Sequence, residues 1–185
     1  MNPAELATVL SELLRRAGIP HAIGGAVAYG FWGNPRGTRD LDLNVFVRVD
    51  QVGRVLDVLN GGGVRFDCAA AARSVRERGD VRGYCDDLPV DVFFVSIPLH
   101  ESAAARTVEV ELLGRTIPIL SAEDLIVLKL LFFRGKDVVD VERMVALQGT
   151  RLDRDYVRRW LVDCVGEEDP RMPQWDDICA ALAAR

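Results

Sequence analysis

The sequence predicts an α+β fold, with a mixed sheet flanked by helices over residues 1–120 and a helical part packed on that core over residues 121–185. Short apolar runs rich in β-branched and aromatic residues alternate with amphipathic stretches in the first part, whereas helical periodicity dominates after Ser121. The chain has 185 residues, 49% of them hydrophobic. That length and composition suit one core of moderate size with a small appended part.

The first part should begin with a helix, because leucines at helical spacing precede the stop signal Gly18. A strand that runs into Gly24 and Gly25 follows, and a short helix starts from this glycine turn. The elements expected up to residue 120 are a helix over 4–17, a strand over 19–23, a helix over 26–33, a strand over 41–49, helices over 50–60 and 69–78, strands over 80–85 and 88–97, and a hairpin over 108–120 that turns at Gly114.

The second part should be helical throughout. Ser121, with Asp124 three residues later, is typical of a helix N-cap, and the apolar run "LIVLKLLFF" follows it. Lys129 interrupts this run, which falls far short of the ~20 residues that a membrane span needs. We therefore expect no membrane association, and further helices over 137–147, 153–165 and 175–184.

Charge and cysteine content limit the class of protein. A net charge of −5 argues against bulk electrostatic wrapping of nucleic acid, although arginines gather locally around Arg39 and between Arg73 and Arg82, so a local positive groove stays open. The four cysteines show no C-x-x-C spacing, which favours reduced thiols. The first residues form an amphipathic pattern and no secretion signal, so we expect a cytoplasmic protein.

Two carboxylates interrupt the predicted strand "LDLNVFVRV" and its approach. Asp40 and Asp42 are two residues apart, so on a strand they share a face while Leu41 and Leu43 point into the core. Two anions this close favour a divalent cation between them, and Mg²⁺ or Mn²⁺ takes carboxylate oxygens together with substrate phosphates. The plainer alternative is a capping Asp40 and a solvated Asp42.

A third carboxylate and a glycine pair extend this pattern. Asp91 lies inside "LPVDVFFV", although aspartate is depleted in strand interiors. If its strand neighbours that of Asp42, three acids could hold one or two metals beside a phosphoryl group; otherwise Asp91 simply follows the "DDLP" turn. Gly24 and Gly25 would let the backbone approach a phosphate at a helix N-terminus, or form a plain turn.

These residues resemble the signature of the polymerase-β-like nucleotidyltransferases, in which a glycine pair precedes an Asp-x-Asp strand and a third acid lies on a later strand. The segment "SAEDLIVLKLLFFRGKDVVDVERMV" is similar to the helical motif of the AbiEii-type nucleotidyltransferases, the toxins of type IV toxin–antitoxin pairs. The positions that match this motif are Lys129, Arg134, Lys136, Asp137 and Asp140.

The resemblance implies attack of an acceptor hydroxyl on the α-phosphate of a nucleoside triphosphate (NTP). Asp40, Asp42 and Asp91 would hold the metal, and Asp91 could take the acceptor proton. The implied nucleotide-binding residues are Gly24, Gly25, Arg39, Lys129, Arg134 and Lys136, and Asp137 would position Lys129 or the acceptor.

The resemblance further implies an RNA acceptor, the 3′ end of tRNA, and a toxin with a cognate antitoxin as partner. Two alternatives stay open. One keeps the reaction but uses a small antibiotic such as an aminoglycoside as acceptor, which the negative net charge suits. The other is a non-catalytic partner or antitoxin that binds nucleotide without turnover.

Overall fold

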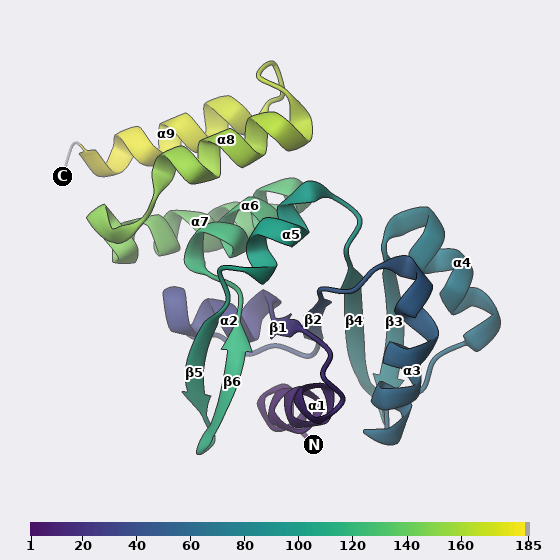
Figure 1. The fold of residues 1–185 in the computed structure, drawn as a ribbon. Coiled ribbons are helices and arrows are strands. Elements are labelled where there is room, and N and C mark those ends of the chain that lie inside the picture. Colours follow the sequence, from purple (N-terminus) through teal and green to yellow (C-terminus); the bar gives the residue numbers. More distant parts are fainter. Residues whose placement is uncertain (184–185) are drawn as a thin grey trace. The chain divides into compact units, whose positions relative to one another are not determined.

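The computed structural model describes residues 1–183, apart from the side chains of residues 68, 69, 182 and 183 (Figure 1). The described chain divides into two compact units. Met1–Ala28 and Arg36–Leu120 form the first, here called the sheet unit, while Tyr29–Pro35 and the chain from Ser121 onward form the second, the helical unit. The predicted α+β class is confirmed by this combination of a mixed sheet and helices.

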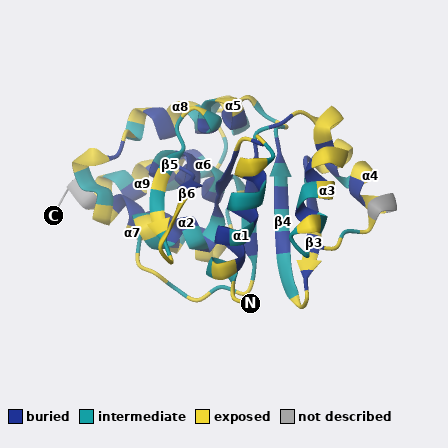
Figure 2. Ribbon diagram, turned by 60° about the horizontal axis from the view of Figure 1, so that its bottom comes forward, coloured by how far each residue is buried: buried dark blue, intermediate teal, exposed yellow. Residues whose placement is uncertain are grey.

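Six strands in the described part of the sheet unit form one mixed sheet with the order β3-β4-β2-β1-β6-β5. β2 pairs with β4, and β1 with β6, in parallel, whereas the other neighbouring pairs are antiparallel. The strands are β1 (His21–Ile23), β2 (Leu41–Val45), β3 (Asp80–Cys85), β4 (Leu88–Phe94), β5 (Val108–Leu112) and β6 (Arg115–Ile119). The central strands β1 and β2 are therefore enclosed by pairing on both edges, and Figure 2 shows how much of the sheet is buried.

The sheet is covered by helices that contact its strands. α1 (Pro3–Arg16) packs on β1, β2 and β6, and its leucines at helical spacing are buried. Asn2 caps this helix, because its side chain accepts a hydrogen bond from the Glu5 N–H. The remaining helices of this unit are the 3₁₀ helix η1 (Val49–Gln51), α3 (Val52–Gly61), α4 (Cys68–Arg78) and α5 (Pro98–Ala104).

The helical unit is built from a set of helices that pack on one another. α6 contacts α7 and α8, and α9 contacts α7 and α8, around a core that includes Trp175. The helices are α6 (Ala122–Phe132), α7 (Gly135–Gln148), the 3₁₀ helix η2 (Gly149–Arg151), α8 (Arg154–Val165) and α9 (Arg171–Ala183). α2 (Gly25–Trp32) begins with residues of the sheet unit and ends with residues of the helical unit. None of the described helices is both long and apolar enough to cross a bilayer.

Most predicted elements are confirmed with shifted ends. The strand predicted over 41–49 ends at Val45, since the chain turns into η1, and α9 starts at residue 171 instead of 175, while position 184 lies outside the described residues. The hairpin turn at Gly114 (φ +72°) and the Ser121 N-cap are both confirmed. α5 was not predicted, because its seven residues are too few to show helical periodicity.

Candidate active site

Asp42 lies in the middle of the sheet. β2 carries it between β4 and β1, with Leu41 and Leu43 fully buried on either side and Asp42 itself half-buried. This is the alternation that the sequence predicts, since neighbouring side chains on a strand point to opposite faces. The strand thus holds the Asp42 carboxylate on a rigid element, on the face opposite to the two leucines.

The glycine pair touches Asp42 directly. The Gly24 N–H donates a hydrogen bond to the Asp42 carbonyl oxygen at 2.9 Å. Gly25 has a φ of +52°, and a Cβ atom there would lie only 1.6 Å from Asp42 Oδ2. A Cβ at Gly24 would lie 2.6 Å from Asn44 Nδ2. Only a residue without a side chain fits at position 25, both for its left-handed backbone and for the carboxylate packed against it.

Asp40 lies immediately before β2, which starts at Leu41. The predicted strand over 41–49 begins at the same residue, and the ladder with β4 starts at Leu41, so Asp40 precedes it. The Thr38 hydroxyl donates to Asp40 Oδ1 in a short contact, which fixes the carboxylate of a residue that no ladder holds. Asp40 is half-buried, while its neighbour Arg39 is exposed.

Asp91 lies on the strand next to that of Asp42. β2 and β4 pair in parallel with Asp42 directly opposite Asp91, so both side chains share one face of the sheet. The condition set by the sequence, that these strands be neighbours, is met. On the other side of β4, Arg82 of β3 is directly opposite Asp91, so Asp42, Asp91 and Arg82 form one row across three strands.

Arg82 binds the Asp91 carboxylate with both ends of its guanidinium group. Its Nε donates to Oδ1 at 2.6 Å and its Nη2 to Oδ2 at 2.7 Å. The Asp91 side chain is 14% exposed and that of Arg82 is 54% exposed. In the sequence, Arg82 is only one of several neighbouring arginines. If the two strands on either side of the "DDLP" turn are paired as a hairpin, Arg82 lies opposite Asp91, and this register could have identified Arg82 as its partner.

The acidic residues supply the donor type that Mg²⁺ or Mn²⁺ prefers, namely carboxylate oxygens. Asp40 and Asp42 fit such an ion chemically, since both are half-buried and hence reachable. Within the part of the chain that the structure describes, no three His, Cys, Asp or Glu side chains are grouped closely enough to hold a metal ion. Metal binding by Asp40, Asp42 and Asp91 stays a prediction.

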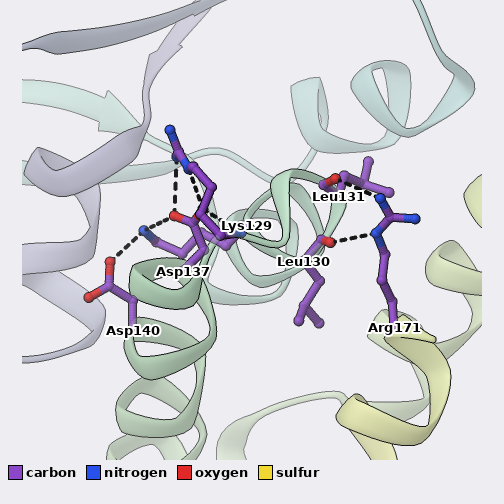
Figure 3. A network of polar contacts seen from close by, with 7 residues as sticks. Lys129, Leu130, Leu131, Asp137, Asp140 and Arg171 are labelled. Atoms are coloured by element: carbon purple, nitrogen blue, oxygen red, sulfur yellow. Dashed lines mark hydrogen bonds and ion pairs between the residues drawn. The ribbon is translucent and has the colours of Figure 1, made fainter.

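Three residues of the second motif, Lys129, Asp137 and Asp140, form a buried network in the helical unit (Figure 3). The Lys129 ammonium lies 2.8 Å from Asp140 Oδ2 and 3.8 Å from Asp137 Oδ1, and the lysine is 5% exposed. The Arg134 guanidinium binds Asp137 in turn, with 2.5 Å between Nε and Oδ2. Lys129 also lies 5.3 Å from the centre of the Tyr29 ring. Lys129 thus neutralises two buried carboxylates from α7.

Two of the predicted nucleotide contacts differ in exposure from Lys129. Lys136 is exposed, and the Arg134 side chain is 56% exposed although it binds the buried Asp137. All residues of this second motif belong to the helical unit, whereas the three acids and the glycine pair belong to the sheet unit. Contacts of these residues with a nucleotide stay a prediction.

No protein-family model matches the chain, and no curated protein matches it in sequence. Solved structures are similar to it in fold. The solution structure of the antibiotic-resistance factor ANT(2″)-Ia is 15% identical, with a TM-score of 0.61 over 98% of this chain and 95% of that one. The fold is that of nucleotidyltransferases.

Two further structures extend this likeness. An antigenic nucleotidyltransferase-like protein from Paracoccidioides brasiliensis is 18% identical, with a TM-score of 0.59 over 100% of this chain and 93% of that one. The lincosamide antibiotic adenylyltransferase LnuA, bound to lincomycin, is 16% identical, with a TM-score of 0.53 over 77% of this chain and 96% of that one. The nucleotidyltransferase fold implied by the sequence is confirmed.

Proposed function

We propose that the protein is a metal-dependent nucleotidyltransferase, which moves a nucleoside monophosphate from an NTP to an acceptor hydroxyl. The observation that carries this proposal is the row of acids on the sheet. Asp42 and Asp91 lie directly opposite each other on neighbouring parallel strands, with Asp42 packed against Gly25, in a fold shared with nucleotidyltransferases.

The reaction forms one bond and breaks one. The acceptor oxygen bonds to the α-phosphorus, the bond from that phosphorus to the bridging oxygen of the β-phosphate breaks, and pyrophosphate leaves. The acceptor proton goes to the Asp91 carboxylate, which β4 holds on the same face as Asp42. Positioning and charge stabilisation account for most catalysis of this kind of transfer, so residues on rigid strands suit it.

Asp40 and Asp42 would hold a Mg²⁺ or Mn²⁺ ion, which neutralises phosphate charge and favours attack at phosphorus. Gly24 and Gly25, at the start of α2, and the exposed Arg39 are the proposed contacts for the triphosphate. From the helical unit we propose Lys129, Arg134 and Lys136. The 3.8 Å contact of Asp137 with Lys129 supports its role in positioning that lysine.

As acceptor we propose a small cationic molecule that carries hydroxyl groups. Among the similar structures, one ANT(2″)-Ia structure holds adenylyl-2″-tobramycin and the LnuA structure holds lincomycin. The adenylylated complex is 14% identical, with a TM-score of 0.59 over 98% of this chain and 97% of that one. The net charge of −5 favours an acceptor with protonated amines over a polyanion.

An RNA acceptor is the second candidate. It rests on the similarity of the segment from Ser121 to Val145 to the AbiEii-type toxins, and on the arginines of α4 and β3, of which Arg73 and Arg76 are exposed. In this version the acceptor is the 3′ end of tRNA, the protein inhibits growth in the cytoplasm, and a cognate antitoxin binds it. Toxicity on expression, relieved by substitution of Asp42, would favour this candidate.

One assay tests the reaction and both acceptors. The purified protein is incubated with Mg²⁺ and each labelled NTP in turn, with either total RNA or a panel of aminoglycosides and lincosamides. We expect label in the small acceptor with wild type, and none with Asp42→Asn or Asp40→Asn, because the amide removes the charge that holds the metal. Asp57→Asn, which changes an exposed residue of α3, is the matched control and should keep full activity.

The outcomes separate the alternatives. Label in tRNA would replace the small acceptor by RNA, and label in neither, with NTP bound, would indicate a binding protein without turnover. Full activity of the Asp40 and Asp42 double variant would refute the assignment of these acids.

A further inference from the structure

Tyr84 is an exposed aromatic residue on the face of the sheet that carries Asp42 and Asp91. It lies on β3 two residues after Arg82, and side chains two residues apart on a strand point to the same face. Because Arg82 is directly opposite Asp91 in the ladder with β4, Tyr84 is a diagonal neighbour of Asp91. Diagonal neighbours lie about 7–8 Å apart, within reach of an aromatic side chain. The phenol therefore belongs to the surroundings of the acids, in the same unit.

The backbone of Tyr84 is held on both sides. On one side it pairs with Pro89 of β4, and on the other an isolated bridge joins it to Arg65. In that bridge the Tyr84 N–H donates to the Arg65 carbonyl oxygen at 2.9 Å, and the Arg65 N–H donates to the Tyr84 carbonyl oxygen at 2.7 Å. Gly83 is buried on the opposite face, where a Cβ atom would lie 2.5 Å from Phe66 Cε1. The position of Tyr84 is thus fixed before any ligand binds.

The Tyr84 side chain is open to a ligand. It is 48% exposed, although a buried aromatic ring contributes much to the stability of a core. Within the described part of the chain, its hydroxyl forms no hydrogen bond and no cation lies over its ring. The rings of Tyr29, Phe132 and Tyr156, in contrast, each have a cation of the chain between 5.0 and 5.5 Å from their centre. Tyr84 thus presents an aromatic face that the protein itself does not use.

The charges near Tyr84 favour a cationic ligand over a polyanion. The charge of Arg82 is balanced by the carboxylate of Asp91, which it binds. The hairpin turn that follows β3 adds the exposed carboxylates of Asp86 and Asp87. The bridge partner of Tyr84 adds one positive charge, and its guanidinium donates to a carbonyl oxygen of the chain at 2.8 Å. Since the quadrupole of a tyrosine ring attracts ammonium groups to its face, the ring and the charges favour the same kind of ligand.

We propose that Tyr84 is a specificity-determining residue that binds a protonated amine of the acceptor over the face of its ring. This inference rests on the proposed nucleotidyl transfer and deepens it, because it says how a cationic acceptor is held. The reacting hydroxyl lies beside Asp91, and the bound amine lies at Tyr84, on the order of 7–8 Å away. The contact therefore selects acceptors in which an amine and the reacting hydroxyl have this separation.

The test measures the binding of tobramycin, an aminoglycoside with several amines, to the purified full chain by isothermal titration calorimetry, without any turnover. Tyr84→Leu should weaken tobramycin binding about fivefold or more, because the aliphatic side chain keeps apolar area but has no aromatic quadrupole. Tyr84→Phe keeps the ring and should bind within about twofold of wild type. Leu113→Ala is the matched control, since Leu113 is an apolar residue of the same unit, 63% exposed, between β5 and β6. It should leave the affinity unchanged, and circular dichroism checks that each variant folds.

Equal affinities of wild type and Tyr84→Leu would overturn the inference. Equal losses in Tyr84→Phe and Tyr84→Leu would overturn it too, because the hydroxyl and not the ring would then make the contact. Absence of tobramycin binding by wild type would also overturn it, while label transferred to RNA would leave the nucleotidyl transfer standing.

Transfer kinetics separate the inference from the function on which it rests. If wild type transfers label to tobramycin, Tyr84→Leu should raise the KM for tobramycin about fivefold or more and lower kcat less than about twofold, because the ring contacts the acceptor away from the reacting atoms. The KM for the NTP should change less than about twofold. Absence of transfer by a wild type that binds tobramycin through Tyr84 would refute the proposed function and leave the contact in place.

Discussion

Substitution of Gly25 by alanine should cost stability moderately and activity severely. The left-handed backbone at φ +52° costs an L-residue about 1–2 kcal/mol. For a chain of 185 residues, each kcal/mol lowers Tm by about 2–4 °C. In addition, the new Cβ would lie 1.6 Å from Asp42 Oδ2 and 2.4 Å from its Cγ. The carboxylate must therefore move by about 2 Å to restore an ordinary contact distance of about 3.5 Å.

A displacement of only about 1 Å at a reacting centre already lowers the rate by about 10²-fold. We therefore expect Gly25→Ala to fold, with Tm lower by roughly 2–8 °C, and to lose nearly all nucleotidyl transfer. Thermal unfolding followed by circular dichroism and the labelled-NTP assay measure the two effects. Gly18→Ala is the matched control, because Gly18 has a φ of +64° and the Cβ of an alanine there would meet no neighbouring side chain or backbone within 4 Å.

The control should lose similar stability and keep wild-type activity. If Gly25→Ala transferred nucleotide at the wild-type rate, the close approach of Gly25 and Asp42 would have no catalytic meaning. If both variants lost activity alike, backbone strain in general, and not the position of Asp42, would explain the loss.

Two further predictions concern buried charges. Lys129→Met should lower the free energy of unfolding by about 3–5 kcal/mol, because it removes the ammonium that lies 2.8 Å from buried Asp140 and 3.8 Å from buried Asp137. Arg134→Met, at a side chain 56% exposed, should cost less than about 1 kcal/mol. Equal costs of the two substitutions in urea unfolding would contradict this reasoning. Burial lowers the pKa of His100 to about 4. Since the unfolded chain takes up that proton near pH 6.5, stability should be full above that pH and fall by up to about 3 kcal/mol between pH 6.5 and 4. His100→Gln should flatten the pH dependence of urea unfolding, and an unchanged slope would assign it to other groups.

Local signals in the sequence predicted local structure well. Gly18 and Ser121 mark helix ends because the hydrogen bonds that complete a helix end join residues only a few positions apart. These helix ends can therefore be predicted without knowledge of the tertiary structure. The seven-residue α5 escaped prediction because it is too short for its pattern to be recognised.

The sequence predicted which types of residue form the site, but not which of these residues contact one another. The acids stood out because aspartate is unusual within strands, yet their relation depends on β2 and β4 being neighbours, which strand order decides and no local pattern encodes. The same holds for Arg82, whose partner is fixed by ladder register. The burial of Lys129 likewise follows from the packing of α6 with α7, which brings Asp140 to it.

The burial of Lys129 also makes the chain a natural reporter of its own opening. The sequence contains two lysines, of which Lys136 is exposed and Lys129 is 5% exposed and ion-paired. A reagent that acylates amines should therefore modify Lys136 and the amino terminus quickly in the native protein. Lys129 can be modified only when the helical unit opens. The rate at which Lys129 acquires the label, followed by mass spectrometry, would therefore measure the rate of opening without any introduced probe.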